Sequence, residues 1–437
     1  MNTKTISFTR HISHREEGSY LLLPFSVPPN VWRLEIRYEY PRCLPRLSAS
    51  SSRCAKKNVV DFALRSASGQ YLGASGSARD TIRISSPGSS DGYAAVPAES
   101  GEWHIIAGAY RIRPEGVDVF YRITFWIKEE ILLKGDPHTH SLRSDGAFSP
   151  RQLSIEAQKK GLDFLFLTDH NNSPFPCIPF PETAARILPG MEWTHYCGHA
   201  GMLGALHPCD NPFCTGAEAL RTQVATKLDQ ARKNGAIVVL HHPFCPDSGW
   251  RLGLDCPHDL IEVWNGGTSS RVTEQTIRWW HRCLCRTRKK IPITGGSDFH
   301  SFEGSASPGT PCLCLYAQSP ELPDILSALR RGNSYLSCNP DGPGLHVSAG
   351  TSLSVLGESL PGETRLNVRF WGLSSGDEIH CITDRRRIGK RTATTPVLNL
   401  TLSLADATFC RFEVRGPIEN GRSRLKLLSN PVYFLKT

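Results

Sequence analysis

The sequence predicts a mixed α/β protein, with a central α/β region between two regions rich in β-structure. Between about residues 129 and 343, short apolar runs alternate with segments of helical periodicity, a pattern typical of strands and helices that take turns in one domain. Outside this region, apolar and polar residues alternate at a period of two, as in strands with one buried face. The length of 437 residues also favours several domains. We therefore expect three domains, at 1–128, 129–343 and 344–437.

Both flanking regions predict small β-sandwich-like domains. In the N-terminal region, the runs at 32–38 and 120–125 alternate apolar and polar residues, and helical periodicity is weak. The runs at 365–370 and 409–414 do the same in the C-terminal region. Antiparallel sheets packed face to face are the usual way to bury such strands.

The central region repeats a helix, a glycine, an apolar strand and then polar residues. A first helix begins with Ser149 and Pro150, which suit its cap and first turn, and ends near Gly161. The apolar run 163–168 follows, and its composition predicts a strand that is buried on both faces. The same order of helix, glycine, apolar strand and polar residues recurs around the run 236–240 and again before Gly295. This order predicts a parallel sheet, and in a (β/α) barrel the chemistry gathers where the strands end.

Charge and cysteine content limit the partners. The net charge of +9 is modest and scattered, which suits an anionic small molecule better than a nucleic acid. No apolar run is long enough to cross a bilayer, and the first residues do not form a secretory signal. The 15 cysteines lack the spacing of a structural zinc site. We expect a cytoplasmic protein that binds a small-molecule substrate, no membrane and no nucleic acid, and that could form a homo-oligomer.

Side chains that bind metals follow one predicted strand after another. His138 and His140 are spaced so that both lie on one face of an extended strand, where they could bind one ion. A series of such residues at the ends of buried strands would leave many polar groups without partners unless they share metal ions. The series comprises His138, His140, Asp169, His170, Glu192, His199, His242, Asp298 and His300.

These motifs resemble those of the PHP (polymerase and histidinol phosphatase) domain. The resemblance rests on the His138–His140 pair with the Ser-Asp-Gly at 144–146, Thr-Asp-His-Asn at 168–171, Gly-x-Glu at 190–192, His-Pro at 242–243 and Ser-Asp-x-His at 297–300. The stretches 190–199 and 261–266 are also similar to the CehA/McbA-type hydrolases. The resemblance implies a distorted seven-stranded (β/α) barrel, flanked here by the β-sandwich-like domains. It also implies two or three divalent ions (Mn, Zn or Fe) and hydrolysis, most often of phosphoesters.

The resemblance also implies which residues bind each ion. His138, His140, Glu192 and Asp298 would hold the first ion. His199, His242 and Glu192 would hold the second, with Glu192 as a bridge between the two. Asp145, His170 and His300 match a third site. Some PHP phosphatases carry a histidine where this chain has Asp145, so this carboxylate could either bind metal or transfer a proton.

The expected mechanism uses a hydroxide that bridges two ions, because close divalent ions lower the pKa of a shared water and polarise the attacked oxygen. Asp145 or His300 would protonate the leaving group. Arg143 would meet a substrate phosphate, and Asp169 would orient a ligand histidine. His241, next to His242 on the strand, is expected to point to the opposite face.

The leading functional hypothesis is a metal-dependent hydrolase that acts as a phosphoesterase on a small anionic substrate. Hydrolysis of a carbamate or carboxylic ester, as in the CehA/McbA type, is the alternative within the enzyme class. A non-catalytic binding protein that keeps the central domain is the alternative outside it. The completeness of the ligand series favours the enzyme.

Overall fold

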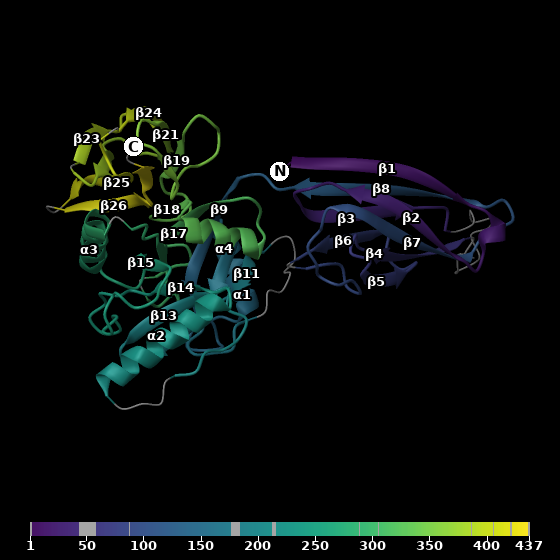
Figure 1. Cartoon of the computed structure of the whole chain (residues 1–437), viewed down its shortest axis with the longest axis horizontal. Coiled ribbons are helices and arrows are strands. Elements are labelled where there is room, and N and C mark those ends of the chain that lie inside the picture. Colours follow the sequence, from purple (N-terminus) through teal and green to yellow (C-terminus); the bar gives the residue numbers. More distant parts are fainter. Residues whose placement is uncertain are drawn as a thin grey trace. The chain divides into compact units, whose positions relative to one another are not determined.

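The computed structural model describes residues 2–42, 58–86, 88–175, 184–211, 216–287, 289–304, 306–385, 387–404, 406–419 and 422–435. These residues form a mixed α/β protein with many strands and, among the described segments, four α-helices. The chain divides into two compact units, Met1–Glu129 and Glu130–Thr437 (Figure 1). None of the described helices has the length and apolar composition needed to cross a membrane.

The first unit consists of two antiparallel sheets of four strands each. One sheet has the order β1 (Asn2–Ile12), β8 (Val117–Ile127), β3 (Val31–Glu39) and β6 (Thr81–Ser85). The other has the order β2 (Tyr20–Val27), β7 (Gly101–Arg111), β4 (Val59–Arg65) and β5 (Tyr71–Gly76), and a 3-10 turn, η1 (His14–Glu16), precedes β2. Both sheets contribute to one apolar core, in which Tyr38, Tyr121 and Trp103 are fully buried.

The second unit contains the predicted strand and helix repeats. Its five-stranded sheet has the order β12 (Glu192–His195), β13 (Gly198–Leu203), β14 (Ile237–Leu240), β15 (Leu260–Asn265) and β16 (Ile293–Gly296). The pairs β14–β15 and β15–β16 are parallel, as expected. However, β13 is antiparallel to both of its neighbours, so the expectation of a purely parallel sheet was wrong. The tight turn between β12 and β13 explains this, because a short connection can join only antiparallel strands.

The second unit also contains an eleven-stranded sheet. Its main path runs β11 (Arg186–Pro189), β10 (Phe164–Leu167), β9 (Ile131–Thr139), β17 (Cys312–Ala317), β18 (Ser334–Ser337), β26 (Arg422–Ser429), β25 (Phe409–Glu419), β22 (Glu378–Thr383) and β23 (Arg387–Thr392). Two further strands, β20 (Ser359–Pro361) and β27 (Val432–Leu435), pair beside it. Single bridges, Thr139 to Phe299 and His170 to Glu192, connect this sheet to the end of β16 and to the start of β12.

The C-terminal strands continue the central sheet. Strand β18 pairs with β26 through Tyr335 and Ser429, and residues 344–437 belong to the same compact unit as the residues before them. A small three-stranded sheet, β19 (Gly344–Ser348), β21 (Arg365–Trp371) and β24 (Leu398–Ser403), shares a core with this region. The separate third domain at 344–437 stays a prediction.

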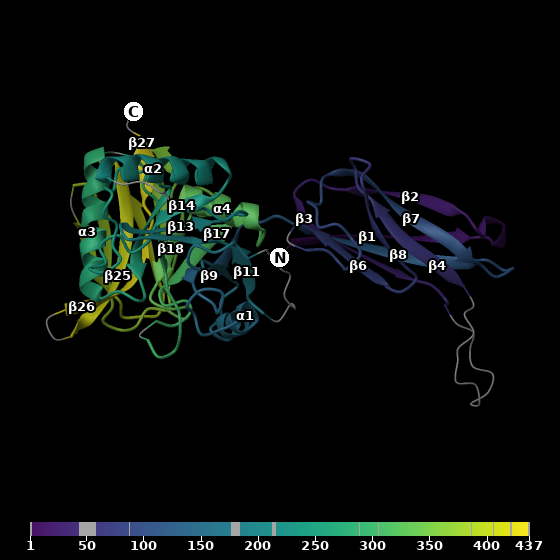
Figure 2. The ribbon, with the colours of Figure 1, turned by 90° about the horizontal axis from the view of Figure 1, so that it is seen from below.

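Four helices cover the strands of the second unit: α1 (Pro150–Lys159), α2 (Ala217–Lys233), α3 (Ser270–Thr287) and α4 (Leu322–Arg331). Helix α1 packs on β10, α2 on β14, α3 on β15 and α4 on β17. Ser149 caps α1 by accepting from the backbone N–H of Gln152, as its position predicts. Figure 2 shows that α3 runs alongside β25.

Candidate metal centre

The chain brings nine of the predicted site residues to one place in the second unit. His138 lies near the end of β9 and His140 just beyond it, while His170 follows β10 and His242 follows β14. Asp298 and His300 follow β16. Glu192 begins β12 and His199 lies in β13, so these two residues stand near strand starts. Asp145 reaches the same group from the loop after β9.

Glu192 is the hub of this cluster. Its carboxylate is fully buried and its oxygens lie 2.9–3.5 Å from ring nitrogens of six histidines. The six are His138, His140, His170, His199, His241 and His242. One carboxylate cannot accept six strong hydrogen bonds at once, but it can bridge cations that the imidazoles also bind.

Asp298 provides a second carboxylate beside the hub. Its Oδ1 lies 3.2 Å from Nε2 of His138 and 3.2 Å from Nε2 of His140, and its Oδ2 lies 3.9 Å from Nε2 of His242. These three histidines therefore lie between two carboxylates. The geometry brings together the first predicted ligand set, His138, His140, Glu192 and Asp298.

A third group lies on the exposed side of the cluster. Asp145 is 56% exposed, and its oxygens lie 3.4 Å from Nε2 of His170 and 3.4 Å from Nε2 of His300. Nδ1 of His140 lies 3.8 Å from the same carboxylate, so His140 faces both groups. His300 is 34% exposed, whereas His138, His140 and Glu192 have no exposed side-chain surface. This group is open to a substrate and the inner one is closed.

Hydrogen bonds fix which nitrogen of each key histidine faces the cluster. Nδ1 of His138 lies 3.0 Å from Glu262 Oε1, and Nδ1 of His300 lies 2.8 Å from the backbone oxygen of Asp298. Because these oxygens only accept, Nδ1 carries the proton in both neutral rings. The Nε2 lone pairs then point at the carboxylates of Glu192 and Asp145, which is the arrangement of histidines that bind metal.

Several buried atoms of the cluster have no hydrogen-bond partner among the described residues: Nε2 of His138, Nδ1 and Nε2 of His140, and Oε2 of Glu192. Unpaired buried polar atoms cost about 1–3 kcal/mol each. Five overlapping sets of three or four His, Asp and Glu side chains place their ligand atoms within 4.8 Å of one another. Nitrogen and oxygen donors of this kind suit Mn, Zn or Fe. The residues present therefore fit divalent metal ions.

The electrostatics of the cluster indicate a strong negative field. Burial alone would lower the pKa of His138, but Asp298, Glu192 and Glu262 together raise it well above its ordinary value. Burial would raise the pKa of Glu192, and the surrounding histidines, His138 first, bring it well below its usual range. A field that holds a proton on a fully buried imidazole also attracts a cation.

The backbone is strained at two of the ligand positions. His242 has a φ of 28° and Asp298 a φ of 55°, and Asn171, which follows His170, has a φ of 44°. Side chains other than glycine adopt such values rarely, at a cost of roughly 1–3 kcal/mol each. Strain after β10, β14 and β16 indicates that these positions serve the orientation of side chains rather than stability.

One expectation about a neighbouring residue needs correction, and a second is not tested. Asp169 does not contact a histidine through any described hydrogen bond. Instead, it accepts from the backbone N–H and hydroxyl of Ser141 and from the hydroxyl of Ser144. Arg143 donates to the backbone oxygen of Ser173, lies 3.8 Å from Asp169 and stacks over Phe175. Both residues hold the loop after His140 in place, and the contact of Arg143 with substrate stays a prediction.

Sequence reasoning missed three residues of the site. His241 stacks on His138 at 3.7 Å and its Nδ1 lies 2.9 Å from Glu192, so the expectation that it points away was wrong. The strand β14 ends at Leu240, and alternation of faces no longer applies beyond it.

Glu262, the second missed residue, accepts from His138 and from the backbone N–H of His242. A lone carboxylate inside the apolar strand β15 was the available signal. Buried Asp136, with a pKa raised by burial to about 6, accepts from the N–H of Gly309 and Ser297.

No family model matches the chain, and no curated protein matches it. Among solved structures, it is similar to a two-domain protein from Bacteroides vulgatus that contains a predicted PHP-like metal-dependent phosphoesterase, with 14% identity, a TM-score of 0.36 and coverage of 69% of this chain and 95% of that one. A proposed metal-dependent phosphoesterase from Bifidobacterium adolescentis has 17% identity and a TM-score of 0.30, over 44% of this chain and 96% of that one.

An amidohydrolase from Chromobacterium violaceum, solved with bound sulfate and no metal, has 18% identity and a TM-score of 0.27, over 47% of this chain and 98% of that one. At these values the likeness is a general one. The case for a function therefore rests on the site itself.

Proposed function

We propose that the chain is a metal-dependent hydrolase that cleaves a phosphoester of a small anionic substrate. The observation that carries this proposal is the hub at Glu192, where six imidazoles meet one buried carboxylate and buried nitrogens of His138 and His140 have no partner among the described residues. A purely structural cluster would leave these atoms unpaired at a cost in stability. Metal binding supplies a reason for the arrangement.

His138, His140, Glu192 and Asp298 would hold one ion, and His199 and His242 would share Glu192 to hold a second. Asp145, His170 and His300 would complete a third site. Divalent ions held there would lower the pKa of a water and polarise the phosphoryl oxygen, so hydrolysis would need no serine or cysteine nucleophile.

The chain's own residues would orient the histidine rings and supply a proton to the leaving group. Glu262 holds Nδ1–H of His138, and the backbone oxygen of Asp298 holds Nδ1–H of His300, so both rings are oriented before substrate arrives. Asp145 and His300 are the exposed members of the cluster, where a leaving group can be reached. One of them would give a proton to the leaving oxygen as the phosphorus–oxygen bond breaks and water supplies the new oxygen.

The proposal includes finer features of the fold and setting. The strands β9, β10 and β12 to β16, connected by the bridges at Thr139 and His170, would form a distorted seven-stranded barrel. The β-rich regions at 1–128 and 344–437 would flank it as sandwich-like domains. A cytoplasmic location, a small-molecule substrate and possible self-association belong to the same hypothesis.

Hydrolysis of p-nitrophenyl phosphate and p-nitrophenyl acetate, with added Mn²⁺, tests this function. We expect phosphate turnover by the wild type, and its loss by at least about a hundredfold together with loss of metal in His140→Ala, because this side chain faces two ligand groups. His207→Ala is the matched control, since His207 is exposed and lies outside the cluster.

Circular dichroism of each variant serves as the check that the fold is kept. Turnover of p-nitrophenyl acetate alone would mean that the chain is an ester hydrolase and not a phosphoesterase. Equal phosphate turnover in His140→Ala and wild type would overturn the proposal.

A further inference from the structure

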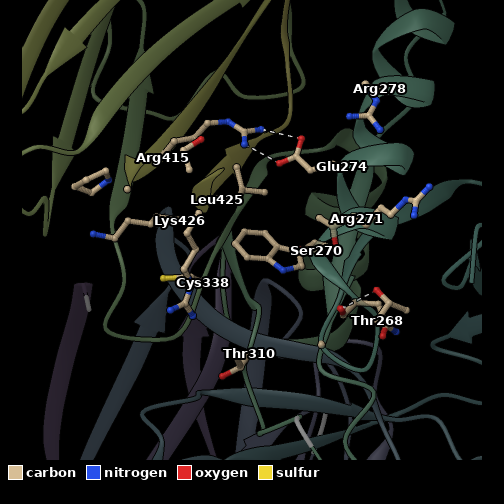
Figure 3. A pocket seen from close by; sticks show the side chains of 18 residues that line it. Thr268, Ser270, Arg271, Glu274, Arg278, Thr310, Cys338, Arg415, Leu425 and Lys426 are labelled. Atoms are coloured by element: carbon tan, nitrogen blue, oxygen red, sulfur yellow. Dashed lines mark hydrogen bonds and ion pairs between the residues drawn. The ribbon is translucent and has the colours of Figure 1, made fainter. Parts of the chain in front are cut away.

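A cavity of about 1060 Å³ lies between α3 and the strands β25 and β26. Arg415 and Lys426 project from the strands, and Arg271 and Arg278 stem from the helix (Figure 3). One end of the cavity is lined by Asn265, whose amide also donates to Asp298 at 3.3 Å. This end is therefore one side chain away from the candidate metal centre.

A second cavity of about 810 Å³ adjoins the first. The two share the lining residues Glu274, Arg278, Arg415 and Ser423. The second continues along α3 to β22, where His380 and Glu378 line it. Together the two cavities form one elongated hollow, here called the α3 hollow.

The α3 hollow is strongly basic. Five Lys and Arg side chains line the first cavity and six line the second, with two shared, so nine cations face the hollow against three glutamates. The whole chain has a net charge of only +9. Lys426 is paired with Asp377 at 2.8 Å, so five positive charges remain in excess at one place, which raises the local concentration of anions.

The three glutamates are already neutralised by other residues of the hollow. Glu274 pairs with Arg415 at 2.7 Å, Glu378 with Lys390 at 2.5 Å and Glu413 with Arg411 at 2.6 Å. Five arginines that line the hollow make no ion pair within the described part of the chain: Arg271, Arg278, Arg282, Arg387 and Arg424. On α3, residues 278 and 282 are four apart and lie on one face.

Two deeply buried side chains in the second cavity also have donors or acceptors that no described residue satisfies. Arg411 is 3% exposed and its Nε has no partner, and His380 is 2% exposed and its Nδ1 has none. Both residues line the cavity. Buried polar atoms without partners are costly, and an anionic ligand in the cavity would relieve the cost at Nε–H of Arg411, which donates. Nδ1 of His380 needs a donor instead, because Nε2–H of this ring faces Glu378 at 3.3 Å.

We propose that the α3 hollow binds a small anion that carries two or more phosphate-type groups. Arginine guanidinium groups suit such groups because they bind two oxygens at once. Each cavity taken singly lies near the upper end of the range of small-molecule sites, about 300–1,000 Å³. A nucleic acid strand fits less well, because strand-binding grooves stack bases on several aromatic rings, and Trp264 is the one Trp, Tyr or Phe among the described residues that line the hollow. The argument for anion binding at this site does not rest on the proposed hydrolase function.

Calorimetric titration with tripolyphosphate tests this site. The titration uses the full chain after removal of metals with a chelator, so that binding at the metal centre does not contribute. We expect binding by the wild type, and affinity at least about tenfold lower in Arg278→Ala/Arg282→Ala, since each unpaired arginine contributes a charge-assisted contact. Arg151→Ala on α1 removes an equally exposed helix arginine and should bind like the wild type.

The outcomes of these experiments distinguish anion binding in the α3 hollow from the proposed hydrolase function. Binding that persists in His140→Ala supports a site apart from the metal centre, whether or not the chain hydrolyses phosphoesters. Equal affinities of Arg278→Ala/Arg282→Ala and Arg151→Ala for tripolyphosphate would overturn the proposed anion site. Affinity for oligothymidylate that keeps rising beyond about four nucleotides would replace the small anion by a nucleic acid strand.

If the enzyme turns over p-nitrophenyl phosphate, inhibition by tripolyphosphate in excess Mn²⁺ identifies the source of the anion. Competitive inhibition that weakens in Arg278→Ala/Arg282→Ala supports a site for the distant groups of the substrate. Inhibition or activation that changes kcat alone supports an effector molecule, separate from the substrate, as the anion that binds in the α3 hollow.

Discussion

Glu262 sets the direction in which His138 presents its lone pair. Its Oε1 receives Nδ1–H of His138 at 3.0 Å, and its Oε2 receives the backbone N–H of His242 at 2.8 Å and the amide of Asn265 at 3.0 Å. One buried carboxylate therefore positions two ligand segments and the wall of the α3 hollow. Groups of this kind orient the ligands of a metal without touching it.

Glu262→Gln should weaken metal binding while leaving all the predicted ligands in place. We expect affinity for Mn²⁺ to fall by roughly ten- to a hundredfold, because the amide cannot act as a charged acceptor for His138. Competition with a fluorescent chelator measures the affinity. Glu218→Gln, at an exposed position at the start of α2, is the control. Unchanged affinity in Glu262→Gln would show that His138 is oriented by other contacts.

At the residue scale, the sequence predicts which candidate ligands lie together, because they belong to short motifs with fixed spacing. His138 and His140, or Asp298 and His300, are two residues apart and come together through local geometry alone. The partners Glu262 and Asp136 could not be predicted in this way, because their roles depend on contacts across 124 and 161 residues of chain. His241 was misplaced because β14 ends just before it.

At the scale of elements, β25 carries a buried charge network toward α3. Glu413 is 2% exposed and pairs with Arg411 at 2.6 Å and with Arg415 at 2.7 Å. Arg415 in turn pairs with Glu274 on α3 at 2.7 Å, so these charges join the strand to the helix. Burial would raise the pKa of Glu413, and the two arginines lower it to about 2.

This network predicts how stability depends on pH. Because the folded pKa of Glu413 lies below that of the unfolded chain, near 4.3, its contribution is complete above about pH 4.3. It is lost as the pH falls toward 2, and amounts to roughly 3 kcal/mol. In urea unfolding, Glu413→Gln should be less stable at pH 7 by about 3 kcal/mol, because it leaves Arg411 without its counter-charge. The gap to the wild type should narrow between pH 4.3 and 2.

The exposed Glu218→Gln serves again as the control for this measurement, with an expected change within about 0.5 kcal/mol. A gap between Glu413→Gln and the wild type that stays constant from pH 7 to pH 2 would mean that Glu413 does not contribute through its charge.

Element types were also more predictable than element pairing. The helices α1 and α2 and the strands β10 and β14 lie where caps, glycines and apolar runs place them. The antiparallel direction of β13 depends on the turn at residues 196–197, which hydrophobic periodicity does not record. Similarly, the alternating pattern of β25 predicts a strand but not that the neighbouring strand β26 pairs with β18.

At the scale of the whole molecule, all nine predicted ligands and the three missed partners lie in the unit Glu130–Thr437. The unit Met1–Glu129 has its own core. The site depends on strands from both large sheets of its unit, since β9 and β10 belong to one sheet and β12 to β16 to the other. Composition and periodicity predict the mixed α/β class, whereas the contact between the sheets is a property of the folded chain.

The central claim is that the histidine cluster around Glu192 binds divalent ions. The most direct test is the metal content of the purified full-length chain, measured by inductively coupled plasma mass spectrometry after dialysis without a chelator. The account predicts two or three ions of Mn, Zn or Fe per chain. A chain that is folded, yet holds no metal even after incubation with each of these ions, would contradict it.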